Sequence, residues 1–241
     1  MELRLSLRFL RRKTPERRQQ SFWNWQESWS AMDKRFAIFD MDGTLIDSMG
    51  FWRNLATEYL GSKGVTQVPE EILRKIKPMT MSESAALFQE VFGLRGNVEA
   101  EMNAMMDEHY RNDIPLKDGV RDYLEMLHKK RVRMCVASAT AEQLMESCLS
   151  RLGIRDYFAF LLSCETVGAG KSSPLVYHES AKRLQANPDE IAVYEDALYA
   201  VQTAKNAGYY VIGVYDEGAA KNWEAVRKIA DEVIKNWEEQ L

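Results

Sequence analysis

The chain has 241 residues, of which 46% are hydrophobic, and its 32 basic and 36 acidic residues give a net charge of −4. This near balance excludes a general attraction to nucleic acid or to an anionic membrane, and no apolar run approaches the roughly 18 residues that span a bilayer. The length suits one large domain, or a core with a smaller insert. Three widely spaced cysteines without a CxxC pair are typical of a reducing compartment. We therefore expect a cytoplasmic protein, with a monomer as the default state.

Residues 1–31 differ in composition from the rest of the chain. Seven arginines and lysines precede a segment that contains Trp23, Trp25 and Trp29. Such a start could mark a membrane-surface or targeting segment, but the apolar part of a secretory signal is missing and acids interrupt the basic run. We expect residues 1–31 to be a dispensable extension, flexible or arising from an upstream start assignment, with the compact domain beginning at Met32.

The first expected strand is the apolar run 36–39, and the segment 48–114 that follows carries four apolar stripes at helical spacing. A crossover between parallel strands needs only about a dozen residues, so this segment is predicted to be an inserted helical subdomain. Ligands of open α/β sheets bind beyond the carboxyl ends of the strands. An insert at that position should therefore cover the site as a cap.

From about Pro115 onward, short apolar strands alternate with amphipathic helices. The expected strands are 132–137, 158–162, 191–194, 209–214 and 232–234, and the expected helices are 120–127, 144–152, 174–184, 197–204 and 219–230. Nearly continuous apolar strands alternating with helices favour an α/β fold with a doubly wound parallel sheet that is covered on both faces. Residues 32–47 and 115–241 would form this core.

Two carboxylates, Asp40 and Asp42, follow the first strand in the sequence DMDGT at positions 40–44. Side chains two apart on a strand share a face, so both acids can reach one site. Buried acids at close quarters are costly unless a cation or a shared proton relieves them. The pair indicates a magnesium-dependent site, although the same run also suits an ordinary turn, and alone the two interpretations are evenly balanced.

Polar groups recur at the ends of three later elements. Ser138 and Ala139 end the strand 132–137, Lys171 follows a glycine-bearing loop, and Glu195 and Asp196 end the strand 191–194. Each alone is better explained as a helix cap or a surface charge. Together they supply a nucleophile, a proton donor, a phosphate clamp and metal ligands at one edge of a sheet, which is the set that phosphoryl transfer requires.

This combination resembles the haloacid dehalogenase-like (HAD) hydrolase superfamily, in the subgroup similar to β-phosphoglucomutase and phosphoglycolate phosphatase. The similarity covers about residues 35–234 and implies a Rossmann-like core with a small α-helical cap over 48–114. Positions 40–44 match the first family motif, Ser138 the second, Lys171 with Pro174 the third, and Glu195-Asp196 the fourth. The chain departs from many relatives at Ala200, where they carry glycine, and this change leaves the implied metal ligands intact.

The resemblance implies a Mg²⁺-dependent phosphomonoester hydrolase that acts on a small phosphorylated metabolite, such as a sugar phosphate. Asp40 would attack phosphorus and form an aspartyl-phosphate, while Asp42 would protonate the leaving oxygen and later deprotonate the attacking water. The implied phosphate-binding groups are Ser138, Ala139 and Lys171, and the implied metal ligands are Asp40, the Asp42 backbone carbonyl, Asp196 and the nearby Glu195.

Substrate choice should lie in the cap, where Trp52, Lys77 and Thr80 are candidate contacts that equally suit surface or packing positions. A phosphomutase of the β-phosphoglucomutase type is the first alternative. Thr44 leans weakly toward hydrolysis, because those members commonly have valine there. A non-catalytic binding or regulatory protein on the same scaffold is the alternative of another class. No nucleic acid or membrane partner is expected.

Overall fold

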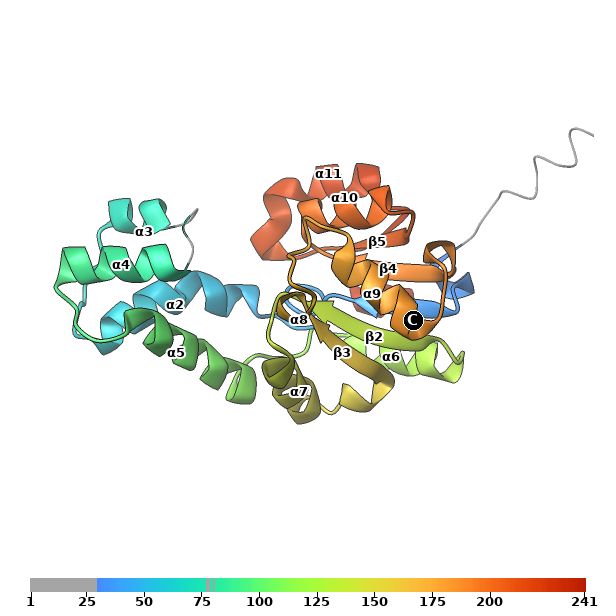
Figure 1. Ribbon diagram of the computed structural model, residues 1–241, viewed down its shortest axis with the longest axis horizontal. Coiled ribbons are helices and arrows are strands. Elements are labelled where there is room, and N and C mark those ends of the chain that lie inside the picture. The colour runs from blue at the N-terminus through green and yellow to red at the C-terminus, as the bar shows by residue number, and fades with distance from the viewer. Residues whose placement is uncertain (1–29, 77–78, 80) are drawn as a thin grey trace, which may run out of the picture.

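The computed structural model describes residues 30–76, 79 and 81–241, and its centre is a six-stranded sheet (Figure 1). The strands are β1 Phe36–Phe39, β2 Arg133–Ser138, β3 Phe158–Ser163, β4 Ile191–Glu195, β5 Tyr210–Val214 and β6 Glu232–Ile234. They lie in the order β3-β2-β1-β4-β5-β6 and every neighbouring pair is parallel. The predicted parallel α/β sheet is therefore confirmed.

Helices cover both faces of this sheet. Within β1, Phe39 packs in one hydrophobic cluster and Ile38 in the other, because successive side chains of a strand point to opposite faces. The cluster of Phe39 includes residues of α6 (Val120–Lys129) and α7 (Glu142–Arg151); the cluster of Ile38 includes residues of α9 (Leu175–Leu184), α10 (Leu198–Asn206) and α11 (Trp223–Ile229). The sheet is thus doubly wound, as the strand composition predicts.

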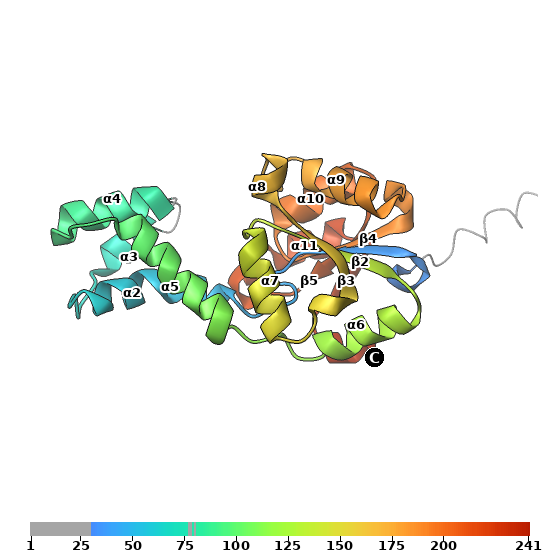
Figure 2. The same ribbon diagram turned by 60° about the horizontal axis from the view of Figure 1, so that its bottom comes forward.

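Four helices form a separate lobe beside the sheet, and we call them the helical lobe. They are α2 (Met49–Ser62), α3 (Glu70–Ile76), α4 (Met81–Phe92) and α5 (Val98–Asn112). Both views place them to one side of the sheet (Figure 1, Figure 2). The chain segments that enter and leave the lobe are paired, because the Asp47 amide donates to the Pro115 carbonyl at 3.0 Å. All four predicted helical stripes of the insert form helices, and the function of this lobe as a cap stays a prediction.

The remaining elements are short. They are helix α8 (Cys164–Val167) and the 3₁₀ segments Ala31–Asp33, Arg155–Tyr157, Pro188–Glu190, Glu217–Asn222 and Trp237–Gln240. The helix expected over 219–230 differs from the structure, in which a 3₁₀ segment precedes α11. In the described part of the chain, no helix has both the length and the apolar character of a membrane span. Of the predicted extension 1–31, residues 1–29 lie outside the described residues.

Candidate active site

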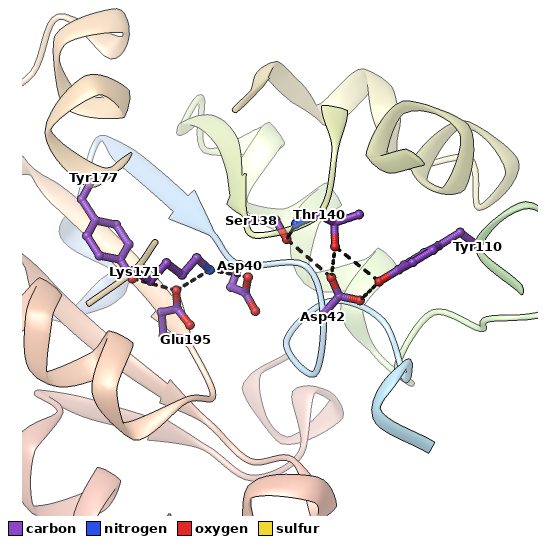
Figure 3. Close-up of polar contacts among 8 residues, drawn as sticks. All are labelled: Asp40, Asp42, Tyr110, Ser138, Thr140, Lys171, Tyr177 and Glu195. Carbon is purple, nitrogen blue, oxygen red and sulfur yellow. Dashed lines mark hydrogen bonds and ion pairs between the residues drawn. The ribbon is translucent and has the colours of Figure 1, made fainter. Parts of the chain in front are cut away.

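The carboxyl ends of the parallel strands meet at one edge of the sheet, and a buried ion pair lies there. The Lys171 ammonium contacts Oδ1 of Asp40 directly after β1, and it lies 2.6 Å from Oε1 of Glu195 at the end of β4. The hydroxyl of Tyr177, from α9, donates to the same Glu195 oxygen at 2.8 Å. Figure 3 shows these four side chains in one row. The structure thus brings three of the predicted site residues together.

Burial governs the charges of this row. Burial opposes the charged form of Lys171, but attraction by Asp40 and Glu195 outweighs it and raises the pKa of the lysine, which stays protonated. Burial also raises the pKa of Asp40, and Lys171 counteracts this effect only in part. Lys171 therefore has one positive charge beside two buried carboxylates, which is too little to neutralise both.

Within the described residues, three buried acids form a group that could hold a metal ion. One carboxylate oxygen from each of Asp40, Glu195 and Asp196 lies within 4.8 Å of the others. Burial, followed by repulsion from Glu195, raises the pKa of Asp196 to about 7. A cation among these oxygens would relieve both effects, and carboxylate oxygens are the hard ligands that Mg²⁺ takes. The donor set fits the predicted magnesium ion, although Glu195 is already paired with Lys171.

The turn after Asp42 allows Asp196 to approach closely. Gly43 has φ +77°, a left-handed conformation that favours glycine, and a Cβ at this position would lie 2.6 Å from Oδ2 of Asp196. A side chain here would displace the acid from the group of three. The glycine of the DMDGT sequence is thus required by both the turn and the packing against Asp196.

Asp42 has a different set of neighbours from Asp40. The Tyr110 hydroxyl donates to Oδ1 at 2.7 Å, and the Thr140 hydroxyl donates to Oδ2 at 2.7 Å. The Ser138 hydroxyl lies 3.5 Å from Oδ2 and accepts the Thr140 amide at 3.1 Å. In Figure 3 the Asp42 carboxylate lies among these hydroxyls and not in the row of Lys171. Its side chain is not part of the acidic group, and the predicted use of its backbone carbonyl as a ligand stays a prediction.

Two further predicted residues lie at the end of β2. Ser138 is buried, while the side chain of its neighbour Ala139 is exposed beside Thr140. The backbone turns into α7 at this point, so amides and hydroxyls are available at the carboxyl edge. Their predicted binding of a phosphate group stays a prediction.

The predicted cap contacts are only partly described. Trp52 lies on α2 with 37% of its surface exposed, and it lines a cavity of about 830 Å³ in the helical lobe. Lys77 and Thr80 lie outside the described residues. The indole Nε1 of Trp52 donates to the Tyr110 hydroxyl at 3.2 Å, so this residue is connected to Asp42 through one intermediate side chain.

Sequence reasoning missed the hydroxyls of Tyr110 and Tyr177. Tyr177 lies within the helix expected over 174–184 and is buried, but helical periodicity does not predict its hydrogen bond to Glu195. A buried tyrosine needs a partner for its hydroxyl, and this rule is the one signal in the sequence that could have drawn attention to either residue.

The comparisons with known proteins agree with this arrangement. Residues 37–214 match the family described as haloacid dehalogenase-like hydrolase. The chain is 28% identical over 190 residues to a phosphorylated carbohydrates phosphatase of Thermotoga maritima, covering 76% of this chain and 88% of that protein. It is 28% identical over 192 residues to a fructose-1-phosphate phosphatase of Escherichia coli, covering 76% and 98%.

A solved structure supports the same relationship. A Thermotoga maritima protein assigned as a β-phosphoglucomutase superposes with a TM-score of 0.72 at 26% sequence identity, covering 85% of this chain and 95% of that one. The family match spans well over half of the chain and includes every polar residue of the sheet edge described above. The chain belongs to the haloacid dehalogenase-like hydrolase family.

Proposed function

We propose that the protein hydrolyses phosphate monoesters of a small phosphorylated metabolite through a covalent intermediate on Asp40. The observation that carries this proposal is the buried contact of Lys171 with Asp40 beside two further acids, with Asp42 held separately by hydroxyl groups. In enzyme class the protein is a phosphoric monoester hydrolase, as both curated relatives named above are.

The two aspartates divide the chemistry. An Asp40 oxygen attacks phosphorus, and the bond from phosphorus to the leaving oxygen breaks as Asp42 donates a proton to that oxygen. Asp42 then takes a proton from water, whose oxygen attacks phosphorus and releases Asp40 with inorganic phosphate. Lys171 contacts the Asp40 carboxylate, so its ammonium is placed to counter the charge that builds on the transferring group.

Magnesium would be held by the carboxylates of Asp40 and Asp196, with Glu195 beside them, and would supply charge neutralisation at the phosphoryl oxygens. Ser138 and the backbone at Ala139 would bind those oxygens from the end of β2. Asp40 and Asp196 are buried and carry raised pKa values, which supports a cation as their partner. This ligand assignment is part of the proposal.

A sugar phosphate is the proposed substrate class. Of the relatives named above, one is described as acting on phosphorylated carbohydrates and another on fructose 1-phosphate. The helical lobe is the place where the rest of such a molecule would be recognised, and Trp52 is the described candidate there.

A phosphomutase is the second candidate, because one structural relative is assigned as a β-phosphoglucomutase. Such an enzyme would return the phosphoryl group from Asp40 to a sugar hydroxyl instead of to water. Release of inorganic phosphate, without an isomerised sugar phosphate, would favour the hydrolase. The non-catalytic alternative predicts neither product.

The test is an assay of purified protein against a panel of sugar phosphates and p-nitrophenyl phosphate with Mg²⁺. We expect phosphate release that EDTA abolishes and added Mg²⁺ restores. Asp40→Asn removes the attacking carboxylate and should lower kcat by at least about 10³-fold. Asp231→Asn, at an acid that pairs with Lys205 and accepts the amide of Val211, is the control and should keep its activity. Retained turnover in Asp40→Asn would contradict the assignment. If no phosphate is released from any ester, the non-catalytic binding protein becomes the favoured alternative.

A further inference from the structure

A side chain of the helical lobe reaches the carboxylate to which we assign proton transfer. Tyr110 lies near the end of α5, is 1% exposed, and donates its hydroxyl proton to Oδ1 of Asp42 at 2.7 Å. The other carboxylate oxygen, Oδ2, accepts the hydroxyl of Thr140 at 2.7 Å. Asp42 is therefore held by one hydroxyl from the lobe and one from the sheet edge.

The protons available to this group fix the direction of its hydrogen bonds. The indole Nε1 of Trp52 is only a donor, and it points to the Tyr110 oxygen at 3.2 Å. The Tyr110 hydroxyl thus accepts from Trp52 and donates its single proton in a hydrogen bond to Asp42, whose carboxylate accepts when ionised. The Tyr110 and Thr140 oxygens are 3.3 Å apart, and when each gives its proton to Asp42 neither remains for this contact. The chain runs from Trp52 through Tyr110 to Asp42.

The backbone of Tyr110 is fixed to the core. The guanidinium of Arg151, at the end of α7, donates from Nε and Nη2 to the Tyr110 carbonyl at 3.3 and 3.2 Å, and from Nη2 to the Ile114 carbonyl at 2.6 Å. A planar guanidinium that binds one carbonyl in the last turn of α5 and one just after the helix holds that turn in one orientation. The Tyr110 hydroxyl is accordingly held in a fixed position beside Asp42.

Trp52 links the Tyr110 hydroxyl to the cavity of the lobe, because it donates to that hydroxyl and lines the cavity. Its ring is 37% exposed and lines the cavity of about 830 Å³, together with Arg53, Leu73 and Met102. A molecule in this cavity would contact the ring of Trp52, whose N–H is two hydrogen bonds away from Asp42.

We propose that Tyr110 is a positioning residue that orients Asp42, and that Trp52 connects the cavity of the helical lobe to this contact. The proposal deepens the proposed function and rests on it, since it concerns the group assigned to proton transfer. Tyr110 acts only through Asp42: with Thr140 bound to the other oxygen, the Tyr110 hydroxyl fixes the orientation of the carboxylate.

Three variants test the chain of bonds with p-nitrophenyl phosphate and Mg²⁺. Tyr110→Phe keeps the ring and removes the hydroxyl, and it should lower kcat about tenfold or more with KM within about twofold. Trp52→Phe removes the N–H and should lower kcat by about three- to tenfold. The double variant should be no slower than Tyr110→Phe, because the indole acts only through the phenol.

Tyr123→Phe is the matched control. Tyr123 is equally buried, and its hydroxyl pairs at 2.9 Å with that of Tyr194 instead of with Asp42. Its kcat should stay within about twofold of the wild type. If Tyr123→Phe is slowed as much as Tyr110→Phe, or if Tyr110→Phe keeps its kcat, the positioning role is wrong. A rise in kcat would also overturn it, because the bond would then hold Asp42 back. Additive losses in the double variant would overturn the link to Trp52.

A spectroscopic measurement is independent of turnover. The indole N–H resonance of Trp52, assigned with Trp52→Phe, should move upfield in Tyr110→Phe while that of Trp237 stays in place. An unmoved Trp52 resonance would overturn the link. Wild-type protein that releases no phosphate overturns the proposed function, whereas wild-type turnover that survives in Tyr110→Phe overturns the positioning role alone.

Discussion

Asp40 and Asp42 are two positions apart in the chain, yet their side chains have different polar partners. Asp40 contacts the ammonium of Lys171, whereas Asp42 accepts the hydroxyls of Tyr110 and Thr140. Strand β1 ends at Phe39, so the alternation of side chains along a strand does not fix where Asp42 points. A charged partner for one acid and neutral donors for the other suit the proposed division into a nucleophile and a proton-transfer group.

Tyr177 is the second tyrosine whose hydroxyl reaches an acid of the site. It donates to Oε1 of Glu195 at 2.8 Å, and the same oxygen lies 2.6 Å from Lys171. In Tyr177→Phe a buried hydrogen bond to a charged acceptor is lost, which should lower the free energy of unfolding by about 1.5–3 kcal/mol. Urea unfolding should show a lower midpoint with an unchanged slope.

The control for Tyr177→Phe is Tyr209→Phe. The Tyr209 hydroxyl is buried with its ring and lies 3.0 Å from Nδ1 of His178. Its removal should cost about 1 kcal/mol, because the partner is an imidazole and not a carboxylate. Equal losses in the two variants would show that the charge of Glu195 adds nothing to the Tyr177 bond.

At this scale the sequence predicts which acids and bases lie together better than it predicts which side chains bind them. Strand-end polar residues can be read directly, because parallel strands all end at one edge. The partners Tyr110 and Tyr177 lie 68 and 18 positions from Asp42 and Glu195, respectively. Helical periodicity indicates that a tyrosine is buried, but only the packing of α5 and α9 decides what its hydroxyl meets.

At the scale of elements, the helices that lead into and out of the lobe are joined through His109 on α5. Its Nδ1 lies 2.7 Å from Asp113 and its Nε2 lies 3.0 Å from Glu58 on α2. An ionised carboxylate only accepts hydrogen bonds. Both ring nitrogens of His109 must therefore carry a proton to donate to Asp113 and Glu58 together. Burial opposes the charge, but the hydrogen bonds to Asp113 and Glu58 outweigh it and raise the pKa of His109 above its ordinary value of 6.5.

This bridge predicts a pH dependence of stability. A raised pKa in the folded protein means that the contribution is fully present below pH 6.5 and is lost as the pH rises through the folded pKa. The difference in unfolding free energy between the wild type and His109→Gln should therefore shrink as the pH is raised above 6.5. Asp113→Asn replaces one acceptor by a neutral amide and should reduce the pH-dependent part. A difference that is constant with pH would contradict the bridge.

Most elements could be predicted, and the exceptions have local causes. The observed strands differ from the expected ranges by at most one residue at an end. Helix α8, Cys164–Val167, has four residues and is too short to show a helical period. Before α11, the side chain of Asp216 accepts the amide of Gly218 at 2.7 Å, and this turn favours the 3₁₀ segment that replaces the start of the expected helix.

At the scale of the whole molecule, a shared hydrophobic cluster and a few polar contacts join the lobe to the sheet, and sequence patterns do not encode the polar contacts. Arg151 binds carbonyls at the end of α5, and the entering and leaving segments pair through Asp47 and Pro115. None of these residues belongs to a sequence motif named above. The sequence therefore predicts that a helical insert follows β1, but not which of its side chains enters the site.

The predicted start of the compact domain at Met32 can also be tested at this scale. Ala31 is buried, and its amide donates to Oε1 of Glu232 on the edge strand β6 at 2.8 Å. A chain that begins at Ser30 after an initiator methionine keeps this bond, so it should match the full chain in kcat and in unfolding free energy. A chain that begins at Met32 loses the bond and should be less stable by about 1 kcal/mol while retaining turnover.

These two truncations separate a start at Ser30 from the predicted start at Met32. Urea unfolding and phosphate release, measured on the full chain and both shorter chains, decide between them. If the Ser30 chain is slower or less stable than the full chain, residues 1–29 contribute to the protein and the extension is not dispensable. If the Met32 chain is as stable as the Ser30 chain, the contact of Ala31 with Glu232 adds nothing to the pairing of β6 with β5 and to the bond from the Tyr210 hydroxyl to the same Glu232 oxygen.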